Sequence, residues 1–167
     1  IRAALTGHLV FSTVHTNDSA STVSRLLDIG VEPYLVSSSL LLVIAQRLLR
    51  TVCPNCREPV EPDQKMRYFL EDLKLTPDQF PDGKIMMGKG CDECFRSGYS
   101  GRTAIYEVMP IDTQIQEQII NKSSASTIKR GALERGLKTL RMDGVQKLLN
   151  GLTTPDEVLR VTQLDVT

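Results

Sequence analysis

Four cysteines arranged as two C-x-x-C pairs constrain the fold of this chain more than any other feature. The pairs are Cys53–Cys56 and Cys91–Cys94, and residues 57–90 separate them. Two residues between thiolates let a tight turn aim both sulfur atoms at one ion, and two facing turns complete a tetrahedral four-sulfur shell. We therefore predict a structural zinc ion bound by Cys53, Cys56, Cys91 and Cys94.

Two other interpretations of the cysteines remain open at this point. The same spacing occurs in thioredoxin-like redox pairs, and four cysteines can also form two disulfides. Zinc is favoured because no cysteine is left over, so that the number of thiols equals the number of ligands in a structural zinc site. Such a closed shell leaves no position for water, and the metal would contribute folding energy rather than hydrolytic chemistry.

Composition places the chain among globular proteins and narrows its partners. Its 167 residues are 41% hydrophobic, enough for one ordinary domain or two small ones. Lys plus Arg equals Asp plus Glu at 20 each, so net charge does not favour a nucleic acid or an anionic membrane. Paired thiols without a signal peptide indicate a reducing cytosol. Because the chain begins at Ile1 rather than at a methionine, we expect it to be a piece of a longer protein.

The first half of the chain has an α/β pattern. Leu9–Val14 is nearly continuous in β-forming residues, which predicts a strand buried on both faces of a parallel sheet. Asn17 or Asp18 can cap the following helix, and Gly30 ends it. A second, largely buried helix is predicted from about Tyr34 to Arg50.

The second half combines an insertion, a strand and several helices. Residues 53–94 form the predicted insertion, closed by the metal and containing a small helix around Met66–Leu75. Arg102–Met109 alternates like a strand that returns to the sheet. Helices follow, capped by Asp112 and by a serine at 124 or 126, with a third over Leu140–Leu149. The last helix is predicted to start with a capping box formed by the residues Thr154 and Glu157.

A short pattern in the insertion imitates a phosphate-binding loop. Residues 83–89 match G-x-x-x-x-G-K, but Gly90 stands where such a loop needs Ser or Thr to hold magnesium. The next residue is Cys91, a predicted zinc ligand, so no helix can start here with its N–H groups aimed at an anion. We therefore interpret the match as chance.

Two histidines flank the predicted strand. His8 precedes it, and His15 follows it, near the edge at which ligands bind in open α/β sheets. From the residues alone, a histidine at a strand end is more often a hydrogen-bonded structural residue. Both interpretations, structural and functional, therefore stay open.

The segment Thr6–Asp18 resembles the histidine box of the ATPases that drive type II secretion and type IV pilus assembly. Further segments are similar to that family in the same order: 46–48 before the first cysteine pair, both pairs, 98–109, 140–144, 151–154 and 157–162. The resemblance thus extends along the whole chain through about six separate motifs. The tetracysteine insertion argues against the pilus-retraction branch of the family, which looks otherwise similar but lacks this insertion.

The resemblance implies an α/β fold, the C-terminal part of a RecA-like P-loop ATPase core with a zinc-binding insertion and an all-helical C-terminal subdomain. The implied parts are residues 1–52 of the core, the insertion 53–94, a returning strand in 95–111 and helices in 112–167. It also implies a homohexamer that uses ATP and magnesium in the cytoplasm, held at the inner face of the bacterial inner membrane by platform proteins of the secretion system, without nucleic acid.

Carried over to this chain, the resemblance assigns an accessory sensor role to His15 and His8 and places Thr13 and His15 near the nucleotide. Neither histidine is expected to be the general base. The family's Walker A and Walker B motifs precede its histidine box, so these 167 residues are expected to be inactive alone. The amino-acid sequence at residues 143–144 and 159–162 favours type II secretion, with type IV pilus assembly as the alternative.

A different class of function, a zinc-ribbon module that binds nucleic acid, rests on the basic content of residues 122–147. This stretch has seven basic and two acidic residues. These charges lie between apolar residues that recur at helical spacing. The favoured interpretation is therefore the solvent-exposed surface of a helix. A docking module for a platform protein or a neighbouring subunit is compatible with the ATPase interpretation.

Overall fold

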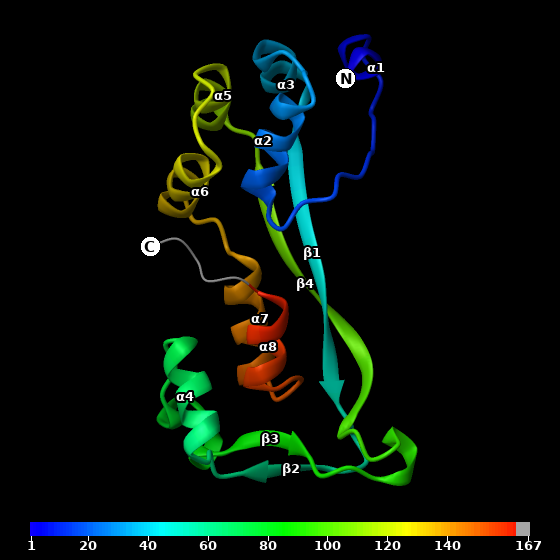
Figure 1. Ribbon diagram of the computed structural model, residues 1–167, viewed down its shortest axis with the longest axis vertical. Coiled ribbons are helices and arrows are strands. Elements are labelled where there is room, and N and C mark those ends of the chain that lie inside the picture. The colour runs from blue at the N-terminus through cyan, green and yellow to red at the C-terminus, as the bar shows by residue number, and fades with distance from the viewer. Residues whose placement is uncertain (163–167) are drawn as a thin grey trace. The chain divides into compact units, whose positions relative to one another are not determined.

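The computed structural model describes residues 1–162 and contains both helices and small sheets (Figure 1). The chain forms two compact units, each assembled from two separate stretches. The first unit comprises Ile1–Gln46 and Tyr106–Thr139, and the second comprises Arg47–Ile105 and residues 140–162. The expected division into four parts stays a prediction, and residues 163–167 of its last part lie outside the described residues. No helix within the described range is long and apolar enough to cross a membrane.

Helices dominate the first unit. They are α1 (Arg2–Leu5), α2 (Ser19–Asp28), α3 (Pro33–Ser39), α5 (Thr113–Ile120) and α6 (Ala125–Glu134). The predicted caps are confirmed: the side chains of Asp18, Asp112 and Ser124 accept hydrogen bonds from the first turns of α2, α5 and α6. The core gathers apolar residues from these helices and from the two long strands: Ala20, Val23, Val36, Val43, Met109, Ile111, Ile115, Ile119, Ile128, Ala132 and Leu137.

The predicted strand at Leu9–Val14 is wrong. The chain between α1 and α2 forms no strand, and its apolar side chains are exposed, with Leu9 at 73% and Phe11 at 87%. A strand forms when the backbone groups of a neighbouring segment complete its hydrogen bonds. Within residues 1–162 no strand pairs with this segment, so its β-forming residues lack the hydrogen-bond partner that a strand needs.

The predicted helix from Tyr34 to Arg50 is wrong beyond its first two turns. Helix α3 ends at Ser39, and the strand β1 (Leu42–Val52) follows. A short apolar run fits a buried helix or a strand equally well. Here the run is a strand because it pairs with the strand β4 (Tyr99–Pro110). The predicted strand at Arg102–Met109 is confirmed as part of β4.

Within the described residues, the second unit contains a two-stranded antiparallel sheet of its own and three α-helices. Strands β2 (Arg57–Val60) and β3 (Ile85–Gly88) pair antiparallel, with Arg57 opposite Gly88. The helices are α4 (Gln64–Asp72), α7 (Leu140–Leu149) and α8 (Pro155–Val161). Because β3 occupies the middle of the stretch 83–89, that stretch is not a phosphate-binding loop, and Lys89 forms an ion pair with Glu58.

The predicted capping box at the start of α8 is wrong, although Thr154 is the N-cap residue. The fully buried carboxylate of Glu157 accepts hydrogen bonds from the backbone N–H of Arg50 at 3.0 Å and from the Arg160 Nε at 2.7 Å. The Arg50 guanidinium also donates to Glu157 Oε1 at 2.5 Å and lies 4.0 Å from the centre of the Tyr99 ring. Charge-assisted bonds from two guanidinium groups outweigh a neutral bond to the cap backbone.

This network predicts a pH-dependent stability for the second unit. Although burial raises the pKa of Glu157, the hydrogen bonds from Arg160 and Arg50 outweigh burial and lower it from 4.5 to about 2. A carboxyl with a depressed pKa stabilises the fold above its unfolded pKa, and that stability is lost as the pH falls from 4.5 towards 2.

We therefore expect Glu157→Gln to lower the free energy of unfolding by about 1–3 kcal/mol at pH 7. The difference between variant and wild type should shrink between pH 4.5 and pH 2 in urea titrations. The control is Glu71→Gln, which changes an exposed glutamate of the same unit. A difference that stayed constant over this pH range would show that the carboxylate charge does not contribute.

Candidate metal centre and histidine segment

Each cysteine pair lies where a strand ends. Cys53 directly follows β1, and Cys56 directly precedes β2, so Pro54 and Asn55 form the connecting turn. The second pair follows β3, and a single 3₁₀ turn over Asp92–Cys94 brings its two thiols to the same side. The strands thus fix the ends of both turns.

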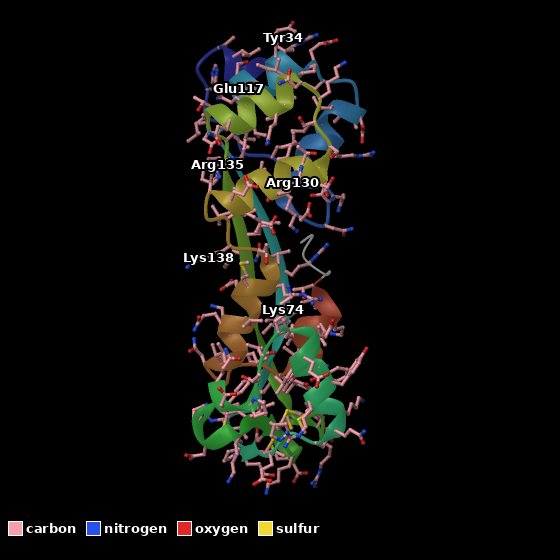
Figure 2. All side chains as sticks on the ribbon, turned by 90° about the vertical axis from the view of Figure 1, so that its left-hand side faces the viewer. Tyr34, Lys74, Glu117, Arg130, Arg135 and Lys138 are labelled. Carbon is pink, nitrogen blue, oxygen red and sulfur yellow. The ribbon has the colours of Figure 1, made fainter. Side chains whose placement is uncertain are left out.

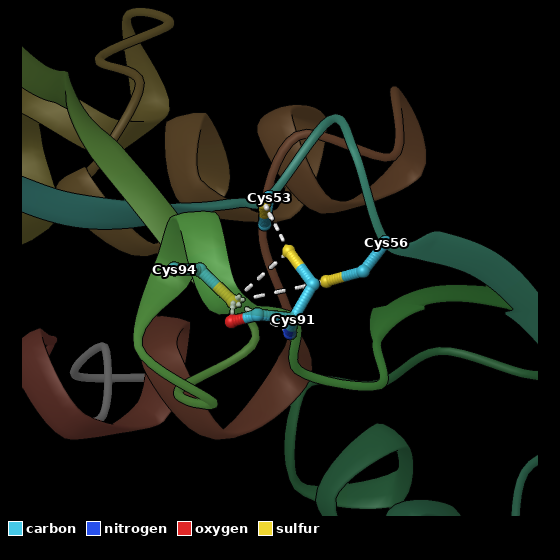
Figure 3. Close-up of side chains that lie close together, drawn as sticks. All are labelled: Cys53, Cys56, Cys91 and Cys94. Atoms are coloured by element: carbon cyan, nitrogen blue, oxygen red, sulfur yellow. Dashed lines mark hydrogen bonds between the residues drawn. The ribbon is translucent and has the colours of Figure 1, made fainter.

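The four sulfur atoms form one cluster (Figure 3). All lie within 4.8 Å of one another. The Sγ atoms of Cys53 and Cys91 are 3.9 Å apart, those of Cys56 and Cys94 3.8 Å, and those of Cys91 and Cys94 3.7 Å. A tetrahedron with sulfur about 2.3 Å from a central zinc ion has sulfur–sulfur edges of about 3.8 Å. The cluster therefore has the dimensions of a four-sulfur zinc shell.

The two disulfides that the sequence left open are not formed. All four cysteines are free, and the sulfur–sulfur distances are far longer than the roughly 2.05 Å of a disulfide bond. Within residues 1–162, these cysteines are also the only group of three or more His, Cys, Asp or Glu side chains close enough to share a metal ion.

Backbone N–H groups prepare one thiol for its charged form. The N–H of Cys91 and the N–H of Gly98 donate to Cys94 Sγ at 3.2 and 3.3 Å, and they lower the pKa of Cys94 to about 6. At Cys56, burial and the neighbouring thiols raise the pKa to about 12. Four thiols this close cannot all ionise without a cation, because their negative charges repel one another. A bound divalent cation would remove that repulsion.

Gly98 connects the two cysteine pairs, and sequence reasoning missed it. Its N–H donates to Cys94 Sγ, while its carbonyl oxygen accepts from the backbone N–H of Cys53 at 2.9 Å. Its φ of +76° lies in the left-handed region, and a Cβ at this position would collide with the carbonyl of Gly88. Its place four residues after Cys94, in a turn rich in Ser and Gly, was the available signal.

The histidine segment is separate from this cluster. His8 is exposed, with its Nδ1 3.0 Å from Thr6 Oγ1 and 3.3 Å from the carbonyl oxygen of Ala3. Thr13 and His15 are exposed in the extended chain before α2. His15 therefore does not follow a strand here, although the assigned sensor role stays a prediction.

Comparison with known proteins identifies similar sequences over nearly the whole chain. The family described as "Type II/IV secretion system protein" matches residues 1–160. The type IV pilus assembly ATPase PilB of Myxococcus xanthus is 46% identical over 165 residues, which are 99% of this chain and 29% of that protein. The type II secretion system protein E of Aeromonas hydrophila is 43% identical over 165 residues, 99% of this chain and 32% of that protein.

A third relative, the type II secretion system ATPase E of Vibrio cholerae, is 41% identical over 163 residues, 98% of this chain and 31% of that protein. The chain thus spans less than a third of the length of each of these three relatives.

The position of Gly98 predicts that Gly98→Ala weakens metal binding. The added Cβ would collide with the carbonyl of Gly88, so residue 98 must shift together with its own N–H, which donates to Cys94 Sγ, and the affinity for zinc should fall by about tenfold or more. Competition with a chromophoric zinc chelator measures this change.

The matched control is Gly136→Ala. Gly136 has a φ of +91°, and no atom lies within 4 Å of the position that an added Cβ would take, so this change adds left-handed strain without crowding. Equal zinc affinities in the two variants would contradict the role assigned to Gly98.

Proposed function

Because this chain belongs to the family of type II/IV secretion system proteins, we propose that it is the C-terminal part of a hexameric ATPase that powers type II protein secretion. The observation that carries this proposal is the identity of 41–46% with secretion and pilus assembly ATPases over at least 98% of the chain. The ATPase acts in the cytoplasm, at the inner face of the inner membrane, where platform proteins of the secretion system hold it.

Type IV pilus assembly is the alternative within the same family. Relatives named for both systems match this chain at similar identity, so identity alone does not separate the two. The amino-acid sequence at residues 143–144 and 159–162 supports type II secretion. Both machines need an ATPase that converts hydrolysis into movement of a partner at the membrane, so the chemistry proposed for this chain is the same in either.

Zinc has a structural role in this proposal. The four sulfur atoms have the spacing of a closed tetrahedral shell, in which no position is left for a reacting water. Its ligands join the end of β1 to the start of β2 and the end of β3 to the turn before β4. Bound metal would therefore hold the ends of four strands in the second unit together.

In this proposal, phosphate binding in the full-length protein comes from residues outside these 167. The stretch 83–89, which matches G-x-x-x-x-G-K, contains the strand β3, and Lys89 forms an ion pair with Glu58. A phosphoryl-transfer site needs a lysine-bearing loop and magnesium to stabilise the transferred group. This chain contributes the histidine segment, in which His15, with Thr13 close by in the chain, senses the γ-phosphate region, with His8 as an accessory residue.

Nucleic-acid binding gains no support from the basic stretch 122–147. Lys129 and Arg141 are buried, and Arg135 donates hydrogen bonds to Asp112 and Gln114. Figure 2 labels Arg130, Arg135 and Lys138, which lie on and just after α6. With three of its seven basic groups engaged within the protein, the stretch has fewer basic groups left to contact phosphates than its composition suggests.

The sensor role predicts a specific kinetic defect for His15→Ala in the full-length, assembled protein. Turnover of ATP should fall by about tenfold to a hundredfold while the KM for ATP changes little, because a residue that organises hydrolysis acts mainly in the transition state. His8→Ala serves as the comparison and should have a smaller effect. Normal turnover by correctly assembled His15→Ala protein would show that this histidine is structural.

A further inference from the structure

The first unit contains a largely buried group of charged and polar side chains that the proposed function leaves unexplained. We call it the anchor cluster, and its members are Asp18, Ser19, Glu107 and Lys129. Asp18 and Ser19 start α2, Glu107 lies on β4, and Lys129 lies on α6. The side chain of Glu107 is 1% exposed and that of Lys129 10%, although charged groups are seldom buried in proteins.

The contacts within the anchor cluster are short and directional. Glu107 Oε1 accepts from the backbone N–H of Ser19 at 2.9 Å and from its hydroxyl at 2.5 Å. The Lys129 ammonium donates to Asp18 Oδ2 at 3.2 Å and lies 3.8 Å from Glu107 Oε2. The neighbouring residues Ser19 and Asp18 are thereby bound by side chains that lie 88 and 111 residues away in the sequence.

Capping of α2 does not require this arrangement. Asp18 Oδ1 already accepts from the backbone N–H of Ser21 at 2.8 Å, which is the ordinary N-cap bond. Glu107 and Lys129 add two buried charges, and taking charges out of water costs free energy that ion pairing only partly returns. Within the described residues, Glu107 Oε2 is buried without a hydrogen bond, so the pairing is incomplete. The cluster is therefore more than a means of stabilising one helix.

The anchor cluster holds the chain just after His15. The hydroxyl of Thr16 lies 2.7 Å from that of Thr22 in α2, and Asp18 and Ser19 are held by the cluster. On the other side of His15, the exposed segment Leu9–Val14 has no strand partner within residues 1–162. The backbone of His15 is therefore fixed from its C-terminal side.

We propose that Glu107 and Lys129 are positioning residues that set the direction in which the histidine segment presents His15. They do so through Ser19 and Asp18, without touching a nucleotide themselves. The consequence for ATP turnover rests on the sensor role proposed above for His15, whereas the consequence for the order of the segment does not. Positions on β4 and α6 thereby control a residue far away in the sequence.

The first test reads the order of the histidine segment directly. Lys129→Met keeps most of the side-chain length but leaves Glu107 buried without its cation. The amide ¹⁵N order parameters of His15 and Asn17 should therefore fall, and their amide hydrogens should exchange faster. Arg135→Met, which removes an exposed ion pair from the end of α6, is the control and should leave these values unchanged.

Adding Glu107→Gln to Lys129→Met should restore part of the order of the segment, because the charge of Glu107 is removed while Asp18 still lacks its bond from Lys129. The glutamine still accepts the Ser19 N–H but carries no charge that needs Lys129. Ser19→Ala, a small change that removes one bond to Glu107, should loosen the segment in the otherwise folded chain. Unchanged order at His15 in both folded Lys129→Met and Ser19→Ala proteins would overturn the proposal.

The second test is a double-mutant cycle in the full-length ATPase. We expect Lys129→Met to lower turnover about tenfold with little change in the KM for ATP, and to lower it less than about twofold when His15 is already alanine. Fully additive losses would show that Lys129 acts independently of His15 and would overturn the kinetic part. If His15→Ala alone left turnover unchanged, the sensor role would fail, and the order measurements would still decide whether the cluster positions the segment.

Discussion

The convergence of four sulfur atoms at one point is the constraint on which the second unit depends. The ends of β1 and β3 and the starts of β2 and of the turn before β4 all contribute to that point, and β2 and β3 have only four residues each. A metal ion bound there would replace the hydrophobic core that so short a pair of strands cannot supply. The strained residues Phe95 and Arg96, both at positive φ directly after Cys94, and the close approach of Gly88 to Gly98 follow from the same requirement.

Each unit also contains one glutamate that is almost completely buried, and the two are used alike. Glu107 accepts from the backbone of Ser19 and faces Lys129, whereas Glu157 accepts from the backbone of Arg50 and from two guanidinium groups. In both cases one carboxylate joins a strand to the first turn of a helix that is distant in sequence. Bonds of this kind need a particular geometry, so they fix how the elements meet more strictly than apolar contact does.

Local signals in the sequence predicted what local chemistry determines. The spacing of the cysteines, the caps at Asp18, Asp112 and Ser124 and the alternation in β4 each act within a few residues, and the structure confirms the caps and the strand. Errors arose where the partner is far away in sequence. The apolar run after Ser39 is a strand because β4 pairs with it, residues 9–14 have no described partner, and Glu157 binds arginines instead of its own helix cap. The roles of Gly98 and of the anchor cluster could not be predicted from the sequence, since they depend on contacts across the fold.

A closed four-cysteine zinc centre can be detected by zinc X-ray absorption spectroscopy on protein purified under reducing conditions, together with the metal content per chain. We expect one zinc ion per chain surrounded by four sulfur atoms at about 2.3 Å, with no nitrogen or oxygen bound to the metal. A shell with fewer than four sulfur atoms, or reduced and folded protein that contains no metal, would contradict it.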